Sequence, residues 1–190
     1  MSLPLRRLDC AQHADGSVVA VLAAEDTALA LTDIPIWIEG LGWCTDTPTL
    51  EMRDWGEAAY AALSAEMAYR MAGISNPAGQ IDFAEICDEY SYKELQHMEA
   101  LKLCMPGEAG HLVETGVTDV NGELPINVSG GALGVGHLFE ASGAHKILEL
   151  VEQLRGEAGV RQIPDVEVGL AQTWRGVPTA TGAVAILSNF

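Results

Sequence analysis

Apolar residues along the chain fall into two patterns, short continuous runs and longer segments with helical spacing. The continuous runs are typical of buried strands, and they lie at residues 17–24, 34–40, 81–88, 165–172 and 182–188. The helical segments are a short one at 25–31 and three amphipathic ones at 55–72, 92–104 and 141–155. This alternation predicts an α/β fold, with helices packed on a largely buried sheet.

The first long helix has readable ends and a predicted buried face. Asp54 is a suitable N-cap with Glu57 three residues later, and Gly73 is a suitable C-cap. Residues at spacings of three and four are expected to face the sheet: Tyr60, Leu63, Met67 and Met71.

Charge and composition exclude several classes of protein. The 190 residues carry 10 Lys and Arg against 27 Asp and Glu, a net charge of −17, which would repel a phosphate backbone, so we expect no nucleic-acid partner. No apolar run reaches the roughly 18 residues that a membrane span needs, and no secretory signal is recognisable. The four cysteines lack a CxxC pair, which argues against a zinc site or a disulfide framework and favours a cytoplasmic protein.

The most unusual segment is residues 124–146, LPINVSGGALGVGHLFEASGAHK, with five glycines before and inside a predicted helix. Glycines in such a place let a ligand approach the backbone and the helix N–H groups. The segment has neither the P-loop pattern nor the dinucleotide fingerprint. His137, in its middle, could be a general base or an oxyanion donor, or a turn histidine that bonds only to backbone.

Two other segments invite a functional and a structural interpretation. Cys87, Asp88 and Glu89 follow a predicted strand, where functional groups often lie, but they equally fit a buried thiol followed by loop acids. Trp174 and Arg175 could line a pocket or could cover a sheet edge.

These segments together resemble the C-terminal half of thiolases, more closely the sterol-carrier-type and archaeal branch. The similarity runs from about residue 5 to the end of the chain. Its most specific part is the glycine-rich segment, with Asn127, Gly130, Gly131, Gly136, His137, Ala141, Ser142 and Gly143. EICDEYS resembles the family's NEAF or HDxF segment, and residues 10–29 resemble its DGA segment.

The resemblance implies the thiolase-fold C-terminal domain, an α/β domain with a mixed five-stranded sheet covered by helices, over residues 33–190. Residues 1–32 would then be the last strand and helix of the N-terminal thiolase repeat. It implies His137 and Cys87 as catalytic residues and a coenzyme A thioester as substrate, with no metal and no bound cofactor. The residues expected to bind substrate are Asn127, Gly130, Gly131, Gly136 and Tyr90.

The chain also departs from the family pattern at positions that matter for chemistry. The acyl-accepting cysteine of thiolases belongs to the N-terminal half, which this sequence lacks. Cys87 replaces the family Asn or His, and Gln172 replaces the closing Cys or His. Leu138 and Glu140 replace a proline and a glycine after the motif histidine. Loss of the second acid/base should impair Claisen condensation more than retro-aldol cleavage, for which Tyr90 or Tyr92 could supply the proton transfer.

Three functions therefore remain open. The first is the C-terminal part of a thiolase-like acyl-CoA acyltransferase that is inactive without its N-terminal half. The second is a thiolase-like aldolase acting on a CoA-linked 3-hydroxyacyl chain, and the third is a non-catalytic scaffold. Expected partners are the missing N-terminal half, a second copy in a homodimer, or an OB-fold protein with a zinc ribbon. Because residues 17–24 are apolar on both faces, we expect a partner to bury them.

Overall fold

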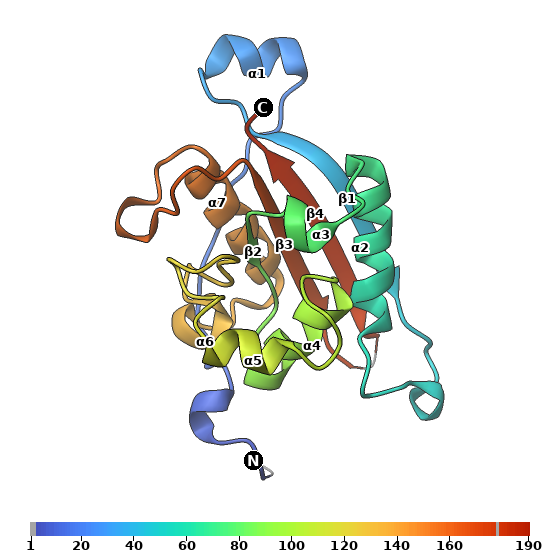
Figure 1. The fold of residues 1–190 in the computed structure, drawn as a ribbon. Helices are drawn as coiled ribbons and strands as arrows, with labels where there is room; N and C mark the ends of the chain where they lie inside the picture. Colours follow the sequence, from blue (N-terminus) through green and yellow to red (C-terminus); the bar gives the residue numbers. More distant parts are fainter. Residues whose placement is uncertain (1–2, 178) are drawn as a thin grey trace.

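The computed structural model describes residues 3–177 and 179–190, so the first two residues of the proposed 1–32 segment lie outside it. A mixed sheet lies at its centre (Figure 1), in the order β1–β4–β3–β2. Its strands are β1 (Trp37–Thr45), β2 (Phe83–Glu85), β3 (Val168–Arg175) and β4 (Thr181–Ser188). β4 is antiparallel to both β1 and β3, and β2 is parallel to β3. The predicted mixed α/β architecture is confirmed, but the sheet has four strands rather than five.

Helices occupy both faces of this sheet. The helices of the body are α2 (Ala59–Ala72), α3 (Pro77–Gln80), α4 (Ser91–Ala100), α5 (Ala109–Glu114), α6 (Gly131–Val135) and α7 (Ser142–Leu154), and α1 (Glu25–Leu31) lies outside it. Short 3₁₀ turns lie at Arg7–Asp9, Leu50–Met52, Phe139–Ala141 and Gly159–Arg161. Within the described residues, no helix combines the length and apolar character needed to cross a membrane.

The sheet separates the two larger apolar clusters of the core. On one face, α2 and α4 pack against β3 and β4 through residues that include Ala65, Ala68, Met98, Leu170 and Ile186. On the other face, α7 packs mainly on β3, with Leu150 and Leu154 against Phe83 and Leu187. In Figure 1, α2 and α4 lie in front of the sheet and α7 lies behind it.

The buried face of α2 differs from the predicted one. Tyr60 is buried, but Leu63 is 50% exposed and Met71 is 63% exposed. The sheet side of the helix consists instead of small residues: Ala61, Ser64, Ala65 and Ala68. The cause lies in β1, where Gly40 and Gly42 let α2 come so close that a Cβ on either would overlap α2 backbone carbonyls. A helix this close to a strand has room only for small side chains at the contact.

Helix boundaries are mostly as predicted, with two corrections. α2 begins at Ala59, because the Asp54 carboxylate accepts the Gly56 N–H in the preceding turn instead of capping the helix. Gly73 ends α2 in the left-handed conformation, as predicted. α4 ends at Ala100 rather than at the predicted residue 104, and its N-cap is Tyr90. The short helix α5 was not evident in the hydrophobic pattern.

The N-terminal part forms an arm that leaves the compact body. Residues 17–24 are extended, but they pair with no strand among the described residues, so the predicted strand is not formed. Val19, Val21 and Leu22 are each at least 79% exposed, and α1 has no buried residue. Among the described residues, no backbone hydrogen bond involves residues 17–23, whereas the Ala24 carbonyl accepts N–H groups from the first turn of α1.

Candidate functional site

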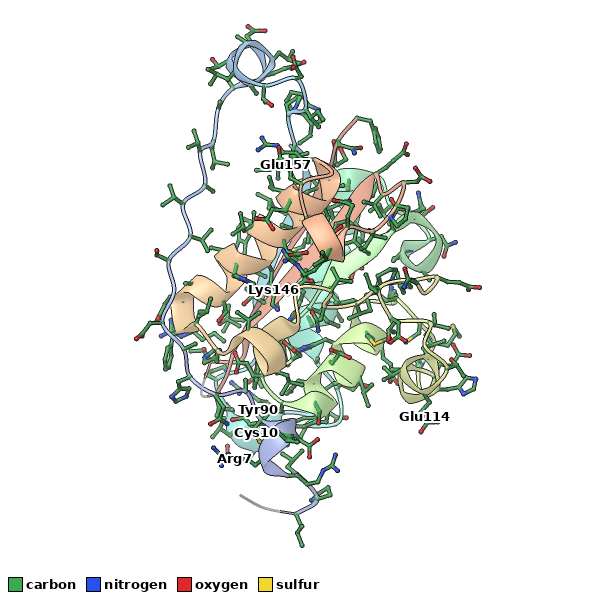
Figure 2. All side chains as sticks on the ribbon, turned by 90° about the vertical axis from the view of Figure 1, so that its left-hand side faces the viewer. Arg7, Cys10, Tyr90, Glu114, Lys146 and Glu157 are labelled. Atoms are coloured by element: carbon green, nitrogen blue, oxygen red, sulfur yellow. The ribbon has the colours of Figure 1, made fainter. Side chains whose placement is uncertain are left out.

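Three segments meet at one end of the molecule: residues 10–14, the loop 87–90 after β2, and the glycine-rich loop that ends at His137. Cys10 and Tyr90 form an isolated antiparallel β-bridge, and His13 and His137 form an isolated parallel β-bridge. Figure 2 shows Cys10 next to Tyr90 near this end. The N-terminal segment thus ties the other two together, and the segments singled out in the sequence lie at one place.

The glycine-rich loop is anchored by Asp88. Its buried carboxylate accepts the backbone N–H groups of Ala132 at 2.7 Å and Leu133 at 3.2 Å, in the first turn of α6. Gly131 has a φ of +58°, and a Cβ there would overlap the Asp88 carboxylate. Lys146, also buried, lies 3.9 Å from Asp88 and donates to the Ile86 carbonyl. Glycine is therefore required at position 131 for this loop to reach Asp88.

Two other residues expected to bind substrate have structural contacts. The Asn127 side chain accepts the Ile86 N–H at 2.7 Å and donates to Glu94 at 2.7 Å, so its amide joins the glycine-rich loop to β2 and α4. Gly130 has a φ of +100° and donates its N–H to the Asn127 carbonyl, which turns the chain into α6. Both residues shape the loop that carries His137.

His137 is held on both sides of its backbone by the N-terminal segment. Its N–H donates to the Gln12 carbonyl at 2.7 Å, and its carbonyl accepts the Ala14 N–H at 3.1 Å. A Cβ on Gly136 would be 2.5 Å from the Ala14 Cβ, so glycine is needed for this close approach. The imidazole is partly exposed, with Nδ1 3.2 Å from a Glu89 carboxylate oxygen.

Cys87 is buried and its peptide group is fixed on both sides. Its N–H donates to the Gln172 side-chain oxygen at 2.8 Å, and its carbonyl accepts the Nδ1–H of His97 at 2.8 Å. Thus two positions that depart from the thiolase pattern, Cys87 and Gln172, contact each other. Burial raises the pKa of the Cys87 thiol to about 12. At neutral pH the side chain is a thiol, which is a weak hydrogen-bond donor and a poor nucleophile.

Glu89 joins the two residues expected to be catalytic. Its carboxylate contacts His137 and also accepts a hydrogen bond from the Cys87 thiol. Burial raises the pKa of this carboxyl group, which is partly offset by His137. The bridging role of Glu89 was not predicted, because the sequence shows it only as one of several acids after a strand.

Behind Cys87 lies a buried cluster of aromatic side chains around an ammonium group. Lys93 Nζ is 4.5 Å from the Trp174 ring centroid and donates to the Tyr60 hydroxyl at 3.1 Å. The Tyr60 hydroxyl is 2.9 Å from Nε2 of His97, which completes a chain of contacts to the Cys87 carbonyl. Burial lowers the pKa of His97 to about 3, so this histidine is neutral in the native protein. Trp174 therefore belongs to this cluster, whereas Arg175 is exposed at the end of β3.

The two tyrosines considered as proton carriers stack on each other. The Tyr90 and Tyr92 ring centroids are 6.0 Å apart, and both side chains are more than one third exposed. Burial raises the pKa of Tyr92, so its hydroxyl is protonated at neutral pH.

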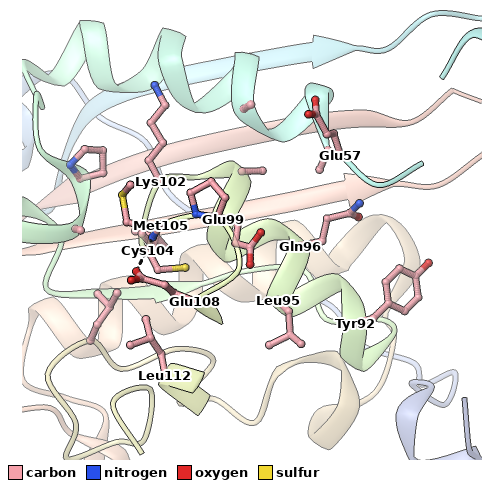
Figure 3. Close-up of a pocket in the computed structure, with 18 of the residues that line it drawn as sticks. Glu57, Tyr92, Leu95, Gln96, Glu99, Lys102, Cys104, Met105, Glu108 and Leu112 are labelled. Atoms are coloured by element: carbon pink, nitrogen blue, oxygen red, sulfur yellow. Dashed lines mark hydrogen bonds between the residues drawn. The ribbon is translucent and has the colours of Figure 1, made fainter. Parts of the chain in front are cut away.

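A large groove of about 1160 Å³ lies on the other side of α4 (Figure 3), between α2, α4 and α5. Its lining includes Leu95, Leu112 and Met105, with Glu99 and Glu108 among the polar residues. Tyr92 and Gln96 reach it, but His137, Cys87 and Glu89 do not line it. The groove is therefore separate from the place where the sequence-predicted residues converge.

Comparison with known proteins agrees with the sequence pattern. A family model described as "Thiolase C-terminal domain-like" matches residues 42–189. The chain belongs to the thiolase C-terminal domain-like family. Among its relatives, the acetyl-CoA acetyltransferase of Methanothermobacter thermautotrophicus is 35% identical over 187 residues, which is 98% of this chain and 48% of that protein. The 17-hydroxy-3-oxo-4-pregnene-20-carboxyl-CoA lyase of Mycobacterium tuberculosis is 33% identical over 93% of this chain and 46% of that protein.

A solved structure gives the same result for the thiolase fold. The structure titled "Ltp2-ChsH2(DUF35) aldolase" matches all of this chain and 48% of its own with a TM-score of 0.84 and 26% identity. This thiolase-like chain spans about half the length of the two relatives named above. The predicted resemblance to a C-terminal thiolase half is confirmed.

Proposed function

We propose that this chain supplies the C-terminal half of a thiolase-like enzyme that breaks or forms a carbon–carbon bond in acyl-CoA esters. The observation that carries the proposal is the contact between His137 and Glu89 at 3.2 Å, at the end of the glycine-rich loop. A partly exposed imidazole on a carboxylate can move a proton at a substrate atom. His137 is the acid/base, and the coenzyme A thioester is a substrate rather than a resident cofactor.

The rest of the glycine-rich loop positions the substrate. Gly130 turns the chain into α6, and Gly131 and Gly136 let the loop come close to Asp88 and Ala14, so these glycines act through the position of the loop that presents His137 to a thioester. Asn127 acts through the shape of the loop, because its side-chain amide is already bonded within the protein. The exposed ring of Tyr90 provides an apolar wall at the same end of the molecule.

Aldol-type cleavage of a CoA-linked 3-hydroxyacyl chain is favoured over thiolysis. Thiolase chemistry needs a thiolate nucleophile and a second acid/base. In this half, Cys87 is a buried thiol with a pKa of about 12, and the Gln172 amide is bonded to the Cys87 N–H. Retro-aldol cleavage needs no enzyme nucleophile, and the relatives named a lyase and an aldolase fit this reaction.

Acyl transfer is the second candidate function. It is favoured by the 35% identity to a protein named acetyl-CoA acetyltransferase, and it requires an N-terminal half that carries a nucleophilic cysteine.

The assembled protein, with the N-terminal half in the same chain or as a second subunit, distinguishes these functions. We expect it to release a carbonyl compound and a shortened acyl-CoA from a 3-hydroxyacyl-CoA without added thiol, as measured by mass spectrometry. Thiolysis of acetoacetyl-CoA that depends on free coenzyme A would favour acyl transfer instead. Turnover of neither substrate class would favour a scaffold and contradict the proposal.

An N-terminal thiolase half is the proposed partner, and two exposed surfaces support it. On β1, Gly40 and Gly42 face α2, so the alternating Leu41 and Trp43 project to the opposite face. Trp43 is 66% exposed there, because α7 packs on β3 and leaves β1 uncovered. The apolar residues of the arm are exposed as well. A homodimer and a second subunit of the OB-fold, zinc-ribbon type are proposed as additional partners. The name of the structural neighbour joins two proteins, Ltp2 and ChsH2, which supports a second subunit of some kind.

Hydrogen exchange of the arm tests this partner. Backbone amides of residues 18–22 have no hydrogen-bond partner among the described residues, so we expect them to exchange within seconds in the chain alone and to become strongly protected in the assembled protein. Amides in α4, which is already packed against α2, are the internal control and should change little. Strong protection of residues 18–22 in a monomer, established by light scattering, would show that the arm pairs within its own chain.

A further inference from the structure

Glu89 is the residue of this end of the molecule for which the resemblance offers no role. We propose that Glu89 is a positioning residue that accepts the Nδ1–H of His137 and so presents Nε2 as the base for aldol cleavage of a CoA-linked 3-hydroxyacyl chain. This inference rests on the proposed function. It adds Glu89 as a second residue to His137, the proposed acid/base.

The first argument is the way the backbone fixes the pair. The Glu89 carbonyl accepts the Ala11 N–H at 2.8 Å, and the His137 N–H donates to the Gln12 carbonyl at 2.7 Å. Two consecutive residues of the N-terminal segment thus bind one member of the pair each. Both side chains are more than 80% buried, at 18% and 19% exposure, so their contact is shielded from water. A carboxylate–imidazole contact of this kind is stronger than one on an open surface.

The second argument concerns the Glu89 carboxylate itself. It also accepts a hydrogen bond from the Cys87 thiol, which keeps its proton because burial raises the pKa of that thiol to about 12. A carboxylate that is bonded to two side chains has a restricted orientation. In this arrangement Cys87 orients Glu89, and Glu89 orients His137.

The charged and titratable groups around Glu89 come from every element packed against it. His137 and the Asp88 carboxylate face it from the neighbouring loops, and Lys146 from α7. Lys93 from α4 and Tyr60 from α2 interact with it at longer range. His13 lies beyond His137, with ring centroids 6.1 Å apart. Among these groups, His137 is the one that forms an ion-pair contact with the Glu89 carboxylate.

Ser142 is the competing partner at Nδ1 of His137. Its hydroxyl oxygen is 3.4 Å from Nδ1, which is longer than the Glu89 contact, and it already accepts the Leu138 N–H at 3.0 Å. If Ser142 donated to Nδ1 instead, the ring proton would be on Nε2, and Nε2 could not act as a base. The two partners therefore predict opposite tautomers.

The proposed step is balanced without an oxidant or a metal. Nε2 of His137 takes the proton of the substrate 3-hydroxyl, and the C2–C3 bond breaks. Its electron pair moves to C2 as the thioester enolate, and C3 becomes a carbonyl carbon. The enolate carbon then takes a proton from the imidazolium, which gives the shortened acyl-CoA and restores His137. The Glu89 carboxylate stabilises the imidazolium between these two proton transfers.

The tautomer of His137 tests the positioning independently of any activity. Nitrogen-15 NMR of the ring in the 190-residue chain, near pH 8, should show the proton on Nδ1. Glu89→Gln should shift the proton toward Nε2, whereas Ser142→Ala should leave it on Nδ1. A wild-type ring with its proton on Nε2, or a tautomer that does not change in Glu89→Gln, would overturn the proposal.

Kinetics of the assembled protein test the consequence for the reaction. Glu89→Gln should lower kcat on the order of 100-fold with little change in KM, and Glu89→Asp should recover part of the loss. Glu114→Gln, at an exposed position on α5, is the matched carboxylate-to-amide control and should retain full activity. An equal loss in Glu89→Asp and Glu89→Gln with an altered melting temperature would show a merely structural role. If the wild-type protein cleaves no 3-hydroxyacyl-CoA, the proposed function fails, while the tautomer measurement still decides the role of Glu89.

Discussion

Replacement of His137 by glutamine in the assembled enzyme is expected to lower kcat by roughly 100- to 10,000-fold, the range typical of general acid/base groups. The imidazole turns Nδ1 toward the Glu89 carboxylate, so Nε2 is the ring nitrogen that can meet a substrate atom. Glutamine keeps a similar size and polarity, but it cannot take up and return a proton at neutral pH. KM should change little, because the loop is held in place by backbone hydrogen bonds that the substitution retains.

The matched control for this variant is His111→Gln. His111 is exposed on α5, outside residues 10–14, residues 87–90 and the glycine-rich loop. The control variant should retain wild-type kcat and KM, and both variants should melt within a few degrees of the wild type. Activity of His137→Gln within threefold of the wild type would exclude His137 as the acid/base and leave the glycine-rich loop with a binding role only.

The 190-residue chain on its own is expected to turn over no acetoacetyl-CoA, whereas the assembled protein has measurable C–C bond activity. The resemblance places the acyl-accepting cysteine in the other half, and three of the four cysteines here are unsuited to replace it. Burial raises the pKa of Cys87 to about 12 and of Cys104 to about 11, and it also raises the pKa of Cys44. These thiols are therefore poor nucleophiles at neutral pH.

The measurement is the loss of acetoacetyl-CoA absorbance with the purified chain, before and after alkylation with iodoacetamide. Heat-denatured chain is the control for the background rate. Turnover that alkylation abolishes would show that one of the four cysteines acts as a nucleophile and that this half is catalytically competent alone.

Sequence patterns predicted the sheet and its helices well where the chain packs on itself. Helices α2, α4 and α7 and strands β3 and β4 lie within a few residues of their predicted positions. The prediction was wrong for residues 17–24, which have strand composition but pair with no strand in the part of the chain that the structure describes. It was also wrong for the buried face of α2, because the close approach at Gly40 and Gly42 depends on contacts between elements far apart in sequence.

The candidate site was predicted in outline and not in its contacts. The glycine pattern around His137 located the loop, and the end of β2 located Cys87. The bridging role of Glu89 could not be predicted, because it depends on how residues 10–14 hold two distant loops against each other. Likewise, the contact between Gln172 and Cys87 joins residues 85 positions apart. Spacing along the chain carries no information on such pairs.

The antiparallel pairing of β1 with β4 also constrains how the chain can fold during synthesis. Thr45 is paired with Thr181, and 136 positions separate them. At about 5–20 residues per second, β1 leaves the ribosome roughly 7–30 s before its partner strand exists. During that interval Leu41 and Trp43 lie on an unpaired strand, and pairings with such long loops also form slowly. Nascent chains should therefore be prone to aggregation early in translation, and chaperones that bind apolar extended segments should associate with residues 37–45 until the C-terminus is released.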